Sequence, residues 1–327
     1  MTGVTKGWAA RAEQSGFAGI LLADSETLVA DPYVELALAG TATNHLQLGV
    51  GVTNPVTRHP AVTAAAIATV QAESGGRAVL GFARGDSALR QLSLAPASVG
   101  ALRQAVLDVR RYLGDPLSTF GDRASTAVPL SWLSDSYSRV PVDVAATGPA
   151  VIAMGAVLAD RLTFNLGADV GLLGWAVDHA KEARSAAGMN PDSISLGAYI
   201  DVACAPRDEA VAMVRGSASI FAQFLEEGMH SGVPVSSEDR AILDAVATRY
   251  SESEHGRSTA PQAELLSDDF LQRFALCGRA DVLLPRVRAL RDLGIDRLVV
   301  VPASRDVDAA VTERSVSAFA RDVMPFV

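Results

Sequence analysis

Glycine and small polar residues gather where one apolar run of the sequence ends. The run 46–52 is typical of a strand, and its end reads Gly51, Val52, Thr53 and Asn54 before a turn that contains proline. Glycine allows a flat ligand to approach the backbone closely, and Thr53 and Asn54 could hydrogen-bond the polar edge of a planar ring. An ordinary tight turn uses the same residue types, so both interpretations stay open.

A second candidate site lies at the start of a predicted helix. Ala146, Thr147 and Gly148 follow an apolar run, and the helix that comes next begins with proline. Free N–H groups and the dipole at a helix start favour a phosphate, whereas a capped helix without a ligand is the alternative. Asn165 ends the next predicted strand, and we expect it to face the same region.

Arg84, Gly85 and Asp86 follow the predicted strand 78–82. Gly85 leaves room for a cofactor, Asp86 could hydrogen-bond a ring or a ribityl hydroxyl, and Arg84 could pair with a phosphate. The segment lacks the lysine of a P-loop. The alternative is structural: Asp86 or Ser87 caps a helix and Arg84 forms an ion pair.

Two carboxylates, Asp24 and Glu26, follow the predicted strand 17–23. A carboxylate at such a position can act as a general acid or base if burial raises its pKa, and a solvated loop is the alternative. The histidines have no zinc-binding spacing, so we predict no metal site. His230 and His255 are expected to be exposed or to reach a substrate.

Composition excludes several classes of protein. A formal net charge of -9 without a basic run argues against nucleic-acid binding. No stretch is long and apolar enough for a membrane span, and the N-terminus lacks a secretory pattern. The two cysteines, Cys204 and Cys277, lie far apart, which favours a reducing cytoplasm over a disulfide framework.

Apolar runs alternate with helical patterns, which predicts a parallel α/β sheet. The seven predicted strands are 17–23, 46–52, 78–82, 142–145, 162–165, 195–203 and 297–301. The predicted helices are 6–14, 31–43, 61–73, 99–113, 149–158, 172–187, 207–227 and 280–293. We therefore expect one (β/α)8 TIM-barrel domain over 1–327 whose first strand is missing or trimmed, unless residues 2–5 form a short strand. Segments 115–139 and 228–275 are predicted insertions near the barrel mouth, the second with extra helices such as 238–250.

Several motifs resemble the bacterial luciferase-like superfamily, and in particular its deazaflavin-dependent branch, which is similar to methylenetetrahydromethanopterin reductase. The resemblance covers nearly the whole chain. The segments that carry it are 51–62, 75–81, 84–89, 140–142, 145–149, 165–169, 267–268, 273–275 and 294–302.

The resemblance implies a TIM barrel that binds coenzyme F420 and transfers a hydride to or from a small organic substrate. It also implies a non-proline cis peptide at Gly51-Val52, with Thr53, Gly85 and Asp86 near the ring. The backbone of 146–148 would then lie near the phosphate-bearing tail.

Many members carry histidine after the second-strand aspartate, where this chain has serine and then Glu26. Asp24 and Glu26 therefore remain the candidate catalytic residues. An FMN-dependent monooxygenase and a non-catalytic flavin-binding barrel are the alternatives, and family members commonly form homodimers.

Overall fold

The computed structural model describes residues 3–115, 127–133 and 138–327. Most of the predicted insertion 115–139 lies outside the described residues. The chain divides into two compact units, the first formed by residues 1–145 and 157–161 and the second by 146–156 and 162–327. Each unit is described by itself, and the single-domain organisation remains a prediction.

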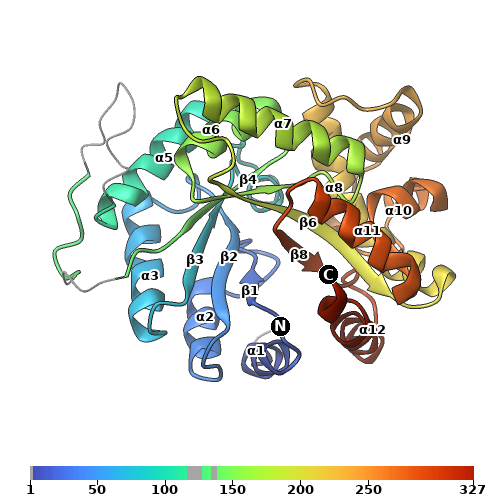
Figure 1. The fold of residues 1–327 in the computed structure, drawn as a ribbon, viewed down its shortest axis with the longest axis horizontal. Coiled ribbons are helices and arrows are strands. Elements are labelled where there is room, and N and C mark those ends of the chain that lie inside the picture. The colour runs from blue at the N-terminus through green and yellow to red at the C-terminus, as the bar shows by residue number, and fades with distance from the viewer. Residues whose placement is uncertain (1–2, 116–126, 134–137) are drawn as a thin grey trace. The chain divides into compact units, whose positions relative to one another are not determined.

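The first unit is built on parallel strands (Figure 1). They are β1 (Gly19–Leu22), β2 (Gln47–Thr53), β3 (Ala78–Phe82) and β4 (Val142–Ala146), whose last residue belongs to the second unit. The register pairs Gly19 with Gln47 and Thr53 with Phe82. Because neighbouring strands run in the same direction, their carboxyl ends lie at one edge of the sheet.

Helices of the first unit pack beside this sheet and beside one another. They are α1 (Thr5–Gln14), α2 (Pro32–Gly40), α3 (Pro60–Glu73), α4 (Ser87–Gln91) and α5 (Val99–Tyr112). The core includes Leu36, Leu48, Ile67 and Leu80, all fully buried. Burial of such side chains is the main source of stability for the unit.

Two helices of the first unit begin at prolines that follow a capping side chain. The carboxylate of Asp31 accepts hydrogen bonds from the N–H groups of Tyr33 and Val34 at the start of α2. At the start of α3, Nδ1 of His59 accepts from the N–H of Ala61 at 3.2 Å. Proline suits the first helical position because its missing N–H would have no partner there. His59 therefore has a structural role at the start of α3.

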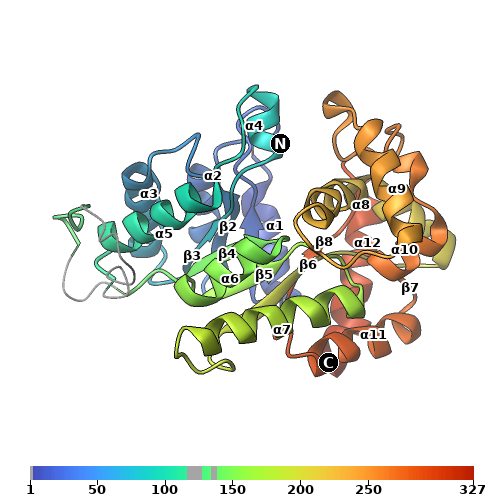
Figure 2. The ribbon, with the colours of Figure 1, turned by 90° about the horizontal axis from the view of Figure 1, so that it is seen from above.

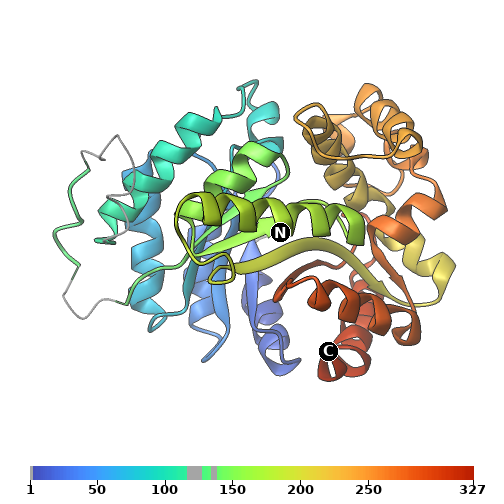
Figure 3. The same ribbon diagram turned by 45° about the horizontal axis from the view of Figure 1, so that its top comes forward.

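The second unit contains β5 (Arg161–Phe164), β6 (Ser195–Cys204), β7 (Leu276–Gly278) and β8 (Arg297–Val301). Strand β6 is the long curved strand in Figure 3, and it pairs in parallel with β8 through 197–201 and with β7 through 202–204. The α-helices are α6 (Pro149–Leu158), α7 (Val170–Ala186), α8 (Arg207–Met229), α9 (Ser237–Thr248), α10 (Asp268–Phe274), α11 (Ala280–Asp292) and α12 (Ala309–Asp322). Single 3-10 turns lie at η2 (Glu252–Glu254), η3 (Ala263–Leu265) and η4 (Met324–Phe326).

The described residues form eight strands where the sequence predicted seven. The additional strand is β7, whose three residues are too few for a periodic pattern to reveal. It follows α10 and lies just after the segment 228–275 that was predicted as extra helices. The idea that residues 2–5 form a strand is wrong for the described part, because residues 3 and 4 are not in a strand and Thr5 begins α1. Among the described residues, no helix combines the length and the apolar character needed to span a membrane.

Candidate functional site

The end of β1 and the end of β2 meet through a buried carboxylate. Oγ1 of Thr53 donates a hydrogen bond to Oδ2 of Asp24 at 2.7 Å, and Nε of Arg58 donates to the same oxygen at 3.0 Å. Asp24 is only 4% exposed. Burial raises the pKa of Asp24, and the hydrogen bonds from Thr53 and Arg58 act in the opposite direction. Burial has the larger effect, so the pKa of this carboxyl group lies above its ordinary value.

Arg58 joins this carboxylate to the cap of α2. Its Nη2 donates to Oδ2 of Asp31 at 2.6 Å, and its guanidinium lies 4.9 Å from the centre of the Tyr33 ring. Burial alone would lower the pKa of Arg58, but its bonds to Asp31 and Asp24 outweigh that effect and raise it. Arg58 is therefore a permanent positive charge beside Asp24. Sequence reasoning missed this role, because 34 residues separate the two partners.

The two predicted catalytic carboxylates have different surroundings. Asp24 is buried, whereas Glu26 is exposed to solvent. The charge of Glu26 has a small influence on Asp24, in the direction that raises the pKa of Asp24. Burial makes Asp24 the better placed of the two for proton transfer.

The ends of β2 and β3 bring the ring-binding candidates of the first unit together. The peptide bond Gly51-Val52 is cis, which confirms the expectation from the family resemblance. The N–H of Ala83 donates to the carbonyl of Thr53 at 2.9 Å. Gly85 has a φ of +85°, and a Cβ there would lie 3.0 Å from Cβ of Asn54. Gly85 thus allows the β3 loop to approach Asn54 more closely than a larger residue would.

The polar members of this group already have structural partners. Oδ1 of Asn54 accepts from the N–H groups of Val56 and Thr57, as in an ordinary turn. Nε of Arg84 donates to the carbonyl of Ala97 at 2.6 Å, although the residue is largely exposed. The turn alternative raised for Asn54 therefore applies, whereas Arg84 bonds a backbone carbonyl and forms no ion pair among the described residues.

Asp86 retains one unused oxygen. Its Oδ1 accepts from Nε of Arg90 at 2.5 Å, while its Oδ2 is buried without a hydrogen-bond partner among the described residues. Its side chain makes no capping bond to α4. Burial raises the pKa of Asp86, and Arg90 opposes the change. A buried polar atom without a partner is costly, so a ligand that donates to Oδ2 would be favoured.

The candidates of the second unit meet at the ends of β4 and β5. The N–H of Asn165 donates to the carbonyl of Ala146 at 2.9 Å, which places the two strand ends side by side. The carbonyl of Gly148, directly before α6, accepts from the N–H groups of Val151 and Ile152. The remaining N–H groups of this first turn and the helix dipole form an environment that favours an anion.

The turn after α8 covers the start of α6. A Cβ added to Gly148 would lie 3.5 Å from Cβ of Ser231, and one added to Gly228 would lie 2.8 Å from Cγ2 of Thr147. Small residues on both sides therefore allow the close packing. The sequence did not point to Ser231. It lies more than 80 residues after Gly148, and no local pattern connects the two positions.

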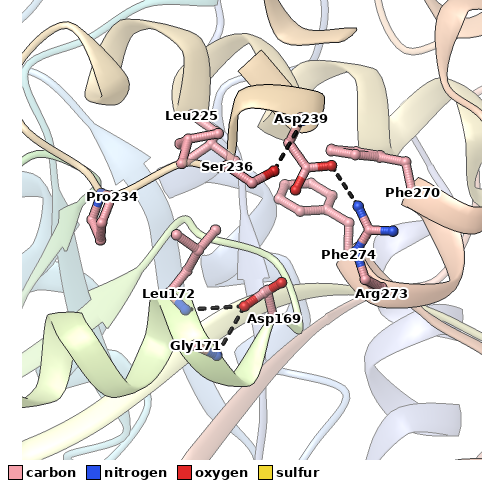
Figure 4. A pocket seen from close by; sticks show the side chains of 11 residues that line it. Asp169, Gly171, Leu172, Leu225, Pro234, Ser236, Asp239, Phe270, Arg273 and Phe274 are labelled. Atoms are coloured by element: carbon pink, nitrogen blue, oxygen red, sulfur yellow. Dashed lines mark hydrogen bonds and ion pairs between the residues drawn. The ribbon is translucent and has the colours of Figure 1, made fainter. Parts of the chain in front are cut away.

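A pocket of about 190 Å³ opens in the second unit (Figure 4). Inside it, Asp169 caps α7 by accepting from the N–H groups of Gly171 and Leu172, and Arg273 forms an ion pair with Asp239. The pocket lining consists of Asp169, Gly171, Leu172, Leu225, Pro234, Val235, Ser236, Asp239, Phe270, Arg273 and Phe274. Most of these residues belong to the predicted insertion 228–275, and none is a site residue predicted from the sequence.

The geometry can be compared with known proteins. The family model for luciferase-like monooxygenases matches residues 4–297. The chain belongs to this family. Its members are oxidoreductases by name, and the enzyme class expected from the sequence is confirmed.

Relatives within this family point to its deazaflavin-dependent branch. The chain is 26% identical to 5,10-methylenetetrahydromethanopterin reductase of Methanolobus tindarius over 310 residues, covering 89% of this chain and 88% of the relative. Two solved structures are similar in fold. The coenzyme F420-dependent tetrahydromethanopterin reductase of Methanopyrus kandleri has a TM-score of 0.76 at 21% identity, covering 98% of this chain and 96% of the other. An F420-dependent secondary alcohol dehydrogenase in complex with an F420-acetone adduct has a TM-score of 0.71 at 18% identity. The match covers 97% of this chain and 93% of the dehydrogenase chain.

Proposed function

We propose that this luciferase-like protein transfers a hydride between coenzyme F420 and a small organic substrate. The relatives described above support the cofactor. The two solved structures are named as F420-dependent enzymes, and the relative from Methanolobus tindarius is named as a methylenetetrahydromethanopterin reductase. The observation that carries the proposal is the group at the ends of β1, β2 and β3. There the cis bond Gly51-Val52, the Thr53–Asp24 hydrogen bond and the close approach of Gly85 occur together.

The first unit offers groups suited to a tricyclic ring. Gly51 and Val52 are half-buried rather than fully buried, so a flat ring could lie against this strand end. Gly85 packs closely against Asn54 and Leu89, where a Cβ would not fit, and Oδ2 of Asp86 could accept a hydrogen bond. Thr53 and Asn54 complete the proposed contacts, and Arg84 is exposed and able to meet a negative charge.

The second unit offers groups suited to the anionic tail of the cofactor. We assign the tail to the start of α6, with contacts from Ala146, Thr147, Gly148 and Asn165. Helix starts bind phosphates through N–H groups and the helix dipole. Ser231, on the turn that packs against Gly148, lies near this helix start, and its hydroxyl donates to the carbonyl of Glu227 at 3.4 Å.

Bound F420 supplies the hydride chemistry, and the protein positions the substrate and manages the proton. Asp24 is the residue we assign to that proton, because burial raises its pKa while Arg58 and Thr53 fix its orientation. Glu26 is the second candidate. The substrate is small, and the pocket lined by the 228–275 insertion is our candidate for its contacts.

The remaining assignments are further parts of the proposal. Both cysteines are buried and free, which suits a reducing cytoplasm. Trp8, Val34, Leu38 and Val62 are exposed apolar side chains on the neighbouring helices α1, α2 and α3. A homodimer could bury this face. The proposed overall fold is a (β/α)8 barrel of the luciferase type.

Cofactor titration tests the proposal. The protein is mixed with oxidised F420 or with FMN, and binding is followed by ligand fluorescence. We expect saturable binding of F420, with Asp86→Asn and Thr53→Val each weakening it by about tenfold, as loss of one good hydrogen bond would. Gly75→Ala is the control, because Gly75 lies away from the cluster with nothing within 4 Å of a Cβ.

Each outcome of this titration has one interpretation. A clear preference for FMN would replace the proposal with an FMN-dependent monooxygenase. Failure to bind either cofactor would favour a non-catalytic barrel. F420 binding that neither Asp86→Asn nor Thr53→Val weakens would support the cofactor and reject the site.

A further inference from the structure

Three side chains that can ligate a metal lie together on helices of the second unit. Glu226 and His230 are one turn apart at the end of α8, and Asp244 is on α9, which packs against α8 (Figure 2). One ligand atom from each residue lies within 4.8 Å of the other two. Nε2 of His230 is 2.8 Å from Oε1 of Glu226.

The charges in this cluster are not balanced. Neither Glu226 nor Asp244 forms an ion pair with a lysine or arginine within the described part of the chain. The two carboxylates therefore lie near each other, and the imidazole of His230 is hydrogen-bonded to Glu226. A divalent cation would offset both negative charges at neutral pH.

We propose that Glu226, His230 and Asp244 form a binding site for a divalent transition metal of the zinc type. Imidazole nitrogen with carboxylate oxygens suits Zn²⁺ and Co²⁺ better than Mg²⁺ or Ca²⁺, which prefer oxygen ligands alone. His230 and Asp244 are exposed, so both side chains can rotate to metal–ligand distances of about 2.0–2.2 Å. Water would complete the coordination.

The metal would connect α8 and α9 where α8 ends. Ser231 and Gly232 follow directly, and they pack against Gly148 and Pro149 at the start of α6. A metal at this position would hold the α8–α9 pair together and stabilise the turn that covers α6. The sequence predicted no metal site, because Glu226 and His230 alone are an incomplete ligand set and Asp244 joins them only through helix packing.

Metal titration of the untagged, full-length protein tests the site. After dialysis against a chelator and its removal, Zn²⁺ binding is measured by isothermal titration calorimetry, and Co²⁺ binding by its visible absorption. We expect one equivalent of each metal to bind, with a higher melting temperature in Zn²⁺. His230→Ala and Asp244→Asn should each weaken binding by at least about tenfold.

His179→Ala is the matched control, because His179 lies on α7 of the same unit, stacked on Trp175 and outside the cluster. This variant should bind the metal like the unchanged protein. The proposal is rejected if the unchanged protein binds no Zn²⁺ saturably, or if His230→Ala and Asp244→Asn bind as tightly as it does. Equal weakening by His179→Ala would reject it too. Cofactor is not needed in any of these measurements, so their outcome does not depend on the proposed enzymatic function.

Discussion

Replacing Asp201 by asparagine should remove a specific pH dependence of stability. Asp201 lies in β6, is 1% exposed, and has an Oδ1 without a hydrogen-bond partner among the described residues. Burial raises its pKa from 3.8 to about 7, and a hydrogen bond from Ser217 acts in the opposite direction. The carboxyl group is therefore protonated in the folded protein over a range where it is ionised in the unfolded chain.

The sign and size of the effect follow from linkage. A carboxyl group with a raised pKa contributes its full stability below the pKa of the unfolded chain, and that contribution is lost as pH rises towards the folded pKa. For Asp201 the window is from 3.8 to about 7. At about 1.4 kcal/mol per pKa unit, the total is about 4 kcal/mol. Asp201 is fully buried, so solvent screening does not reduce this value.

Urea unfolding measures the effect directly. The free energy of unfolding of the unchanged protein and of Asp201→Asn is determined at intervals from about pH 4.5 to 7.5, and the two are subtracted so that other titrating groups cancel. We expect the variant to gain about 3 kcal/mol relative to the unchanged protein over this range. Ser217→Ala should shift the window to higher pH. A difference that stays constant with pH would refute the reasoning.

Two further predictions concern packing. Gly85→Ala should destabilise the protein by about 1–3 kcal/mol more than Gly75→Ala, measured by urea unfolding. Both glycines have positive φ, but only at Gly85 would a Cβ meet a side chain, 2.6 Å from Leu89; equal costs would contradict the close approach inferred here. Cys204 and Cys277 should not react with Ellman's reagent in the native protein at neutral pH, because burial raises the pKa of both thiols, that of Cys277 to about 12. Both should react in denaturant, and rapid labelling of the native protein would show that either thiol is accessible.

The sequence by itself determined most of the elements. Strands 78–82 and 297–301 and helix 149–158 have the predicted bounds. These segments combine a local periodic pattern with strong end signals such as proline at a helix start. The family motif at 51–62 also led to the cis bond Gly51-Val52. Such features depend on a few neighbouring residues, and a linear pattern contains that information.

Only the tertiary structure decided which side chains meet. Asp24 and Arg58 are far apart in sequence, and they form a pair because adjacent parallel strands end at one edge. Asp244 joins His230 because α9 folds back on α8. Strand β7 exists because β6 provides hydrogen-bonding partners for three residues that would not form a strand alone. Contacts between distant segments depend on register and packing, and neither is written in the local sequence.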